Sequence, residues 1–117
     1  MTIIKDAFNI ILYIYKEKVS TGNIPQNDEI FKSTGWNQIR YENALDFCIK
    51  EGYISVCKFM GTDGNGFQNM DIDDLTPFAI TLIEKGESKE GKQKIYALFN
   101  IENFNLDSII KGEFKLF

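Results

Sequence analysis

The sequence predicts a single α+β domain in which helices pack around a β-hairpin. The chain has 117 residues, 44% of them hydrophobic, which is enough for one core and too little for two. Apolar residues recur at helical spacing over residues 3–19, which indicates an amphipathic helix. Residues 53–60 alternate, and the glycine-rich residues 61–66 follow them. That pattern is typical of a strand and a hairpin turn.

The first helix carries more apolar surface than one core face needs. Its main stripe consists of Ile4, Ala7, Phe8, Ile11, Leu12 and Tyr15. Outside that stripe lie Ile3, Ile10, Tyr13 and Ile14. A second partner must cover this surplus, either the C-terminal segment or another copy of the chain. We expect a homodimer that forms through the first helix and the C-terminal helices.

Two further helices follow in the first half of the chain. Asn27 is a plausible N-cap for a short helix that ends near Ser33, since asparagine caps helices well. Asn37 caps the next helix in the same way. That helix places Tyr41 and Leu45 toward the core. It closes at Gly52, where a left-handed glycine ends the helix.

The second half of the chain is predicted to be mostly helical. Residues 67–72 return as the partner strand, and Thr76-Pro77 then opens a helix that stops at Gly86. Residues 89–99 form a fifth helix. Helical spacing continues from Asn105 through Phe117, although Gly112 weakens it. We therefore expect a domain over residues 1–86 and a C-terminal helical extension over 87–117 within the same folding unit.

The order helix, short helix, turn, helix, hairpin, helix resembles the winged helix-turn-helix superfamily. The segment NALDFCIKEGYI is similar to the end of a recognition helix that runs into the first wing strand. DEIFKSTGW is similar to the supporting helix and turn, and LTPFAITLIEKG to the helix after the wing. These segments lie within residues 3–86. Within the superfamily the chain is most similar to small bacterial and phage proteins of the YjcQ type.

The resemblance implies duplex DNA binding by a small transcriptional regulator, with the third helix in the major groove. Arginine, asparagine and glutamine are the side chains whose geometry suits base edges. The expected groove contacts are Asn37, Gln38, Arg40 and Asn43. The expected phosphate contacts are Lys32, Lys50 and Lys58.

The charge of the same region favours a different use. Residues 27–53 carry three basic and five acidic side chains, and residues 54–86 carry two basic and five acidic. A surface of that sign repels a duplex unless its charges segregate by face. The alternative is a non-enzymatic module that binds a protein through an acidic surface. Phe47, which we expect to point outward, would then contact the partner.

Enzymatic chemistry is not expected. The chain has no histidine, which removes imidazole acid-base catalysis and the usual zinc clusters. Cys48 and Cys57 are interpreted as reduced core residues. The acidic residues 71–74 are interpreted as a solvated strand end, and we expect no metal and no cofactor. No signal peptide or membrane span is apparent, so we expect a cytoplasmic protein.

Overall fold

The structure is a computed structural model, and it describes residues 3–58 and 70–117. Within these ranges the chain forms six helices and one two-stranded antiparallel sheet. The elements are α1 (Ile3–Thr21), α2 (Asn27–Thr34), α3 (Gln38–Lys50), β1 (Ile54–Lys58), β2 (Met70–Leu75), α4 (Pro77–Glu84), α5 (Lys89–Phe99) and α6 (Leu106–Ile110). The α+β class predicted from the sequence is confirmed.

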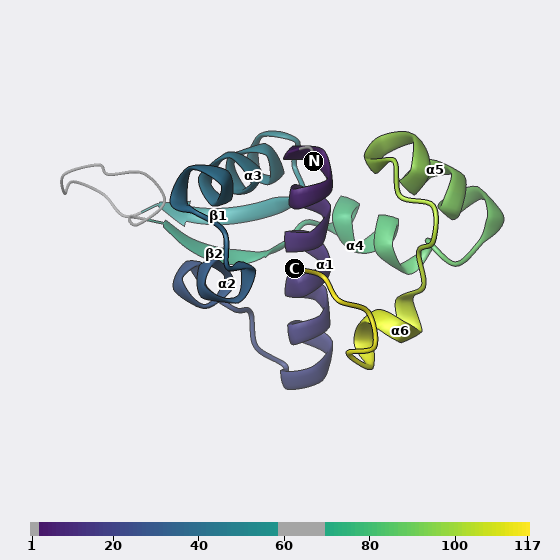
Figure 1. The fold of residues 1–117 in the computed structure, drawn as a ribbon, viewed down its shortest axis with the longest axis horizontal. Helices are drawn as coiled ribbons and strands as arrows, with labels where there is room; N and C mark the ends of the chain where they lie inside the picture. The colour runs from purple at the N-terminus through teal and green to yellow at the C-terminus, as the bar shows by residue number, and fades with distance from the viewer. Residues whose placement is uncertain (1–2, 59–69) are drawn as a thin grey trace.

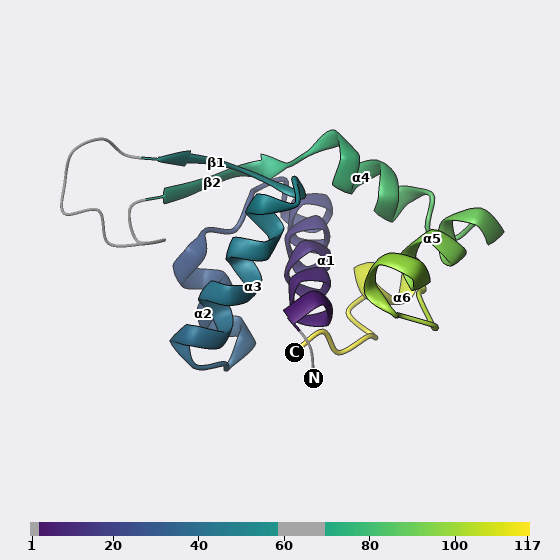
Figure 2. The same ribbon diagram turned by 90° about the horizontal axis from the view of Figure 1, so that it is seen from above.

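Helix α1 lies at the centre of the molecule. Helices α2 and α3 and the sheet lie on one side of it, and α4, α5 and α6 lie on the other (Figure 1). The view from above shows α1 and α3 side by side, with the two strands passing across their ends (Figure 2). Because α1 has neighbours on both sides, Ile10 and Ile14 are buried together with Phe8 and Ile11.

Most of the surplus apolar surface of α1 is therefore covered within the chain: Ile10 and Ile14 are buried and Tyr13 is half-buried, whereas Ile3 is exposed. Phe99 of α5 stacks on Phe8, with ring centroids 4.2 Å apart. Phe104, in the segment between α5 and α6, also packs against Phe8, with ring centroids 6.1 Å apart. Of the two partners considered for this surface, the C-terminal half supplies the cover. The expected homodimer is thus not needed to bury it and stays a prediction.

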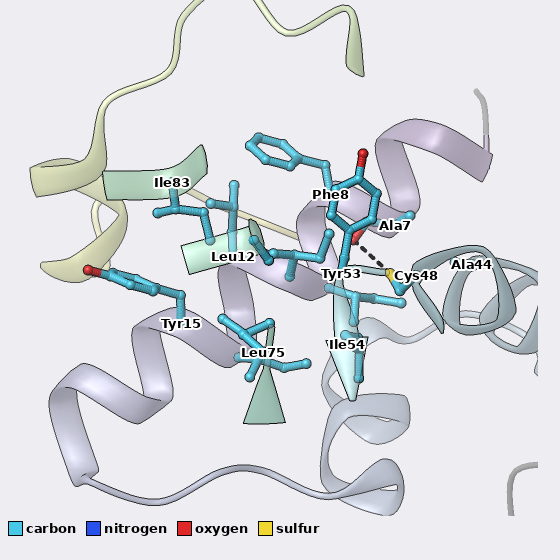
Figure 3. Packing of buried hydrophobic residues seen from close by; sticks show 14 of the residues in the cluster. Ala7, Phe8, Leu12, Tyr15, Ala44, Cys48, Tyr53, Ile54, Leu75 and Ile83 are labelled. Carbon is cyan, nitrogen blue, oxygen red and sulfur yellow. Dashed lines mark hydrogen bonds between the residues drawn. The ribbon is translucent and has the colours of Figure 1, made fainter. Parts of the chain in front are cut away.

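The core continues from α1 into α3 and the sheet. Figure 3 shows Ala7, Cys48 and Ile54 meeting at this junction. The Cys48 thiol donates a hydrogen bond to the Ala7 carbonyl, at 3.4 Å. Burial raises the pKa of this thiol well above its usual value. Cys48 is a core residue as predicted, whereas Cys57 is exposed and its prediction as a core residue is wrong.

The two strands form a short antiparallel ladder with one irregularity. Ile54 pairs with Leu75, and Lys58 pairs with Met70. The register shifts between Ser55 and Val56, as a β-bulge does. The predicted turn at 61–66 lies outside the described residues, and β2 runs three residues further along the chain than the predicted 67–72.

Most helix ends follow the capping residues that the sequence offers. Asn37 and Thr76 cap α3 and α4 with their side chains, and Gly52 has a left-handed φ of 77° after α3. Helix α5 has the predicted bounds. Asn27 is not an N-cap, because Gln26 occupies that position in a reciprocal capping box with Glu29.

The last predicted helix is much shorter than its spacing suggested. It ends at Ile110, and Gly112 then takes a φ of 77°, a left-handed conformation that glycine adopts without strain. Residues 111–117, which we call the return segment, lie back against the face of α1 (Figure 1). Among the described residues, no helix is long and apolar enough to cross a membrane.

Candidate functional site

The outward face of α3 is the surface at which the sequence predicts binding. Helix α3 buries Tyr41, Ala44, Leu45 and Cys48. At 3.6 residues per turn, the side chains opposite this stripe are Ile39, Asn43, Asp46 and Lys50. All four are exposed, and Ile39 reaches 74%. Among the described residues, the most exposed large hydrophobic side chain therefore lies in the first turn of α3.

Arg40 is half-buried, and its guanidinium is bound to a carboxylate of α1. Its Nε donates to Oδ2 of Asp6 at 2.8 Å, and its terminal Nη2 donates to Oδ1 at 2.9 Å. The guanidinium also lies 4.2 Å from the centre of the Trp36 ring. Asp6 is only 4% exposed. The hydrogen bonds to Asp6 raise the pKa of Arg40, so its guanidinium stays charged.

This pairing matters because Arg40 is the only arginine in the chain. Arginine is the residue whose fork of donors suits guanine best. The position of Arg40 on α3 explains why it pairs with Asp6. It lies about 100° from Tyr41 on the helical wheel, on the flank that faces α1 rather than opposite the core. Contact with a base would require Arg40 to leave Asp6 without its partner.

The other predicted groove contacts differ in how they are engaged. Asn37 Oδ1 accepts a hydrogen bond from the backbone N–H of Arg40 at 2.9 Å, because Asn37 is the N-cap. The Gln38 side chain donates to Glu42 at 2.7 Å. Asn43 is exposed on the outward face. Of the four, Asn43 alone combines exposure with a central place on that face.

The predicted phosphate contacts do not gather into a basic patch. Lys32 is exposed on α2. Lys50 pairs with Asp46 at 3.0 Å along α3, and both side chains are mostly exposed. Lys58 ends β1, and the structure describes its backbone pairing alone. Phe47 is half-buried against the core, so it points outward less than predicted.

Carboxylates dominate the surface around α3. They come from α2, from α3 and its C-cap, and from β2. Those exposed or half-buried are Asp28, Glu29, Glu42, Asp46, Glu51, Asp71, Asp73 and Asp74, the last paired with Lys18 of α1. The described lysine side chains on the same elements are Lys32 and Lys50. With Arg40 already neutralised by Asp6, the surface is net negative.

Side-chain amides fix the strand β2 against α2. Gln26 Oε1 accepts from the Ile72 N–H at 2.8 Å, and Gln26 Nε2 donates to the Ile72 carbonyl at 2.9 Å. Asn27 donates to the Met70 carbonyl at 2.9 Å. The Tyr41 hydroxyl in turn donates to Asn27 Oδ1 at 3.1 Å. These bonds satisfy the edge of β2 as a third strand would, and they hold α2, α3 and β2 as one surface.

Several of these residues were missed by sequence reasoning. Ile39 lies about 160° from Tyr41 on the wheel, which placed it outside the core stripe from the start. Asp6, a charge within an apolar helix, was the signal for a buried partner. Gln26 and Asn27 carried no such signal, because their role depends on the distant strand β2. Asparagine before a helix predicts a cap far more readily.

Within residues 3–58 and 70–117 no three His, Cys, Asp or Glu side chains cluster closely enough to hold a metal ion. Comparison with protein-family models, with curated proteins and with solved structures gives no match to this chain. The function must therefore be argued from the α3 surface itself.

Proposed function

We propose that the chain is a winged-helix type of domain that uses its α3 surface to dock a basic partner protein. The order of α1, α2, α3, β1 and β2 and the placement of α3 beside the strands support this architecture. The observation that carries the docking role is the pairing of the only arginine with Asp6. A DNA-binding face would instead collect its cations outward.

The α3 surface has the composition of a protein-binding face. Ile39 provides an exposed apolar anchor on the outward line of the helix. Glu42 and Asp46 lie three and seven residues further along the same helix, on or beside its outward line. Charged rims of this kind select partners of opposite sign and speed association, while a central apolar side chain supplies the affinity. Lysine and arginine near an apolar side chain are therefore the chemistry that the partner must present.

Two synthetic peptides test the proposal. Both carry Leu and Phe at the same positions, and the remaining positions are lysine in one and glutamate in the other. We expect the lysine peptide alone to bind, as followed by fluorescence anisotropy, and to bind more weakly as salt is added. Substitution I39S should weaken binding about fivefold to thirtyfold, because loss of roughly 1 to 2 kcal/mol of apolar burial corresponds to that range.

Matched controls separate docking from nonspecific charge attraction. V19S removes another exposed apolar side chain, at the distant end of α1, and should leave binding unchanged. Duplex DNA is the competing ligand. If the chain binds a duplex with a steep salt dependence, and N43A weakens that binding, the docking proposal is wrong and the DNA-binding prediction stands.

A further inference from the structure

The return segment ends on an aromatic site at the start of α3. After α6, Gly112 turns the chain back, and the segment then reaches α1 and the α2–α3 turn. The Phe117 ring lies 5.5 Å from the Tyr13 ring and 5.4 Å from the Trp36 ring. Leu116 is half-buried beside the core. Phe117 thus joins α1 to the residue that precedes the α3 cap.

The receiving site is built from side chains that are fixed independently of the return segment. We call Tyr13, Ser33, Trp36 and Arg40 the Trp36 site. The Tyr13 and Ser33 hydroxyls share a hydrogen bond of 3.0 Å. Arg40 lies over the Trp36 ring and is anchored to Asp6. Because these contacts do not involve Phe117, the site keeps its walls when the ring leaves.

The return segment is held by backbone hydrogen bonds at its start and by apolar packing at its end. Its backbone hydrogen bonds to α6 involve the N–H groups of residues 111–114. Beyond them, Phe117 packs edge-on against Trp36, at an interplanar angle of 85°, and tilts against Tyr13. Beyond the burial of Leu116 and Phe117, the two aromatic contacts favour the closed position by roughly tenfold to a hundredfold. A ligand with modest affinity for the Trp36 site can therefore displace the segment.

The sequence of the return segment matches the chemistry required of the partner. Residues 114–117 read Phe-Lys-Leu-Phe, which places a lysine among apolar side chains. The Trp36 site adjoins the outward face of α3, because Ile39 follows Trp36 by three residues in the first turn. A partner that covers Ile39 and extends past the Asn37 cap to Trp36 would reach the position that Phe117 fills.

We propose that the return segment is an internal competitor that occupies the Trp36 site until an aromatic side chain of the basic partner displaces Phe117. The competition rests on the proposed docking function, but the occupancy of the site does not. The segment acts on the α3 surface without changing its charge. The apparent affinity of the α3 surface for the partner then depends on the fraction of molecules in which Phe117 has left the Trp36 site.

Trp36 is the only tryptophan in the chain, so its indole N–H gives a single NMR signal from the site. The probe is the pentapeptide Glu-Phe-Lys-Leu-Phe, titrated into a chain that ends at Gly112 and into the 117-residue chain. We expect a saturable shift of the indole signal in the shortened chain, and at least tenfold weaker binding in the longer one. A probe that ends in alanine should give no shift.

Two variants of the 117-residue chain serve as controls in case the shortened chain misfolds. F117A should open the site and admit the probe. F114A removes a ring that is 40% exposed and should leave the site closed. No indole shift in F117A, or equal probe affinity in F117A and F114A, overturns the proposal.

The lysine peptide then tests the competition. It should bind F117A at least fivefold more tightly than F114A. If F117A admits the probe but binds the lysine peptide no more tightly than F114A does, the proposed competition is wrong. If the peptide binds neither variant, the docking function fails, and the probe titration still decides whether Phe117 occupies a releasable site.

Discussion

Substitution R40A should destabilise the domain, because it leaves a buried carboxylate without its partner. Asp6 is 4% exposed, and its two oxygens accept the two hydrogen bonds from Arg40 at 2.8 and 2.9 Å. Removal of one partner from a fully buried pair costs about 3 to 5 kcal/mol. The Arg40 side chain is 34% exposed, so water reaches Asp6 in the variant and reduces the cost to about 2 to 3 kcal/mol. That loss corresponds to a fall in Tm of about 10 °C.

Urea unfolding of four proteins measures the coupling free energy between Asp6 and Arg40. The proteins are wild type, R40A, D6N and the double variant. We expect the double variant to be less destabilised than the sum of the two single variants, with a coupling free energy of about 1 to 3 kcal/mol. K50A is the matched control, since Lys50 also pairs with a carboxylate but both side chains are mostly exposed. It should change the free energy of unfolding by less than about 0.5 kcal/mol.

The same variant distinguishes a structural Arg40 from one that contacts DNA. If R40A keeps the wild-type free energy of unfolding but loses affinity for a duplex, the guanidinium is available for base contact. The role assigned to the Asp6 pair is then wrong. If R40A loses stability and no duplex binds even the wild type, the internal role stands.

Three further predictions concern Gly91 and the two cysteines. G91A should lower the free energy of unfolding, measured in urea, by at least about 2 kcal/mol, because an added Cβ would overlap the Lys85 carbonyl of the preceding turn. Equal stability of G91A and wild type would show that α5 can shift away from Lys85. Burial raises the pKa of the Cys48 thiol above its value in the unfolded chain, which is about 8.5. The stability that this thiol contributes is therefore fully present below about pH 8.5. Above about pH 8.5 the free energy of unfolding falls by about 1.4 kcal/mol per pH unit. Urea unfolding between pH 8 and 9.5 should show this slope in wild type and a flatter one in C48A. In the native state a thiol reagent should modify Cys57 and leave Cys48 intact.

The sequence predicted the elements that local rules determine. Helix α5 and the Thr76-Pro77 start of α4 follow from spacing and capping residues a few positions apart. The extent of α6 did not follow, because the spacing through Phe117 could not show that the chain would turn at Gly112 and place that ring on Trp36. Local pattern does not report contacts between segments that are distant in sequence.

The candidate site was predicted in position but not in chemistry. The sequence located the α3 face and its acidic surroundings, and Asn43 and Lys50 lie on that face as expected. Arg40 was assigned to DNA because arginine suits bases, but its use depends on Asp6, which lies 34 residues earlier. A polar residue in a helix is assigned outward by default. A buried charge on a neighbouring helix is what reverses that assignment.

Helix α1 connects the two surface proposals. Asp6 holds Arg40, and Arg40 lies over Trp36, while Tyr13, two turns further along α1, contacts Phe117. The position of Trp36 therefore depends on α1 at both points. A change that releases Arg40 from Asp6 would remove one wall of the Trp36 site as well as cost stability, so the return segment should be held less firmly in R40A. The pair that takes the only arginine away from the surface thereby also shapes the site that Phe117 fills.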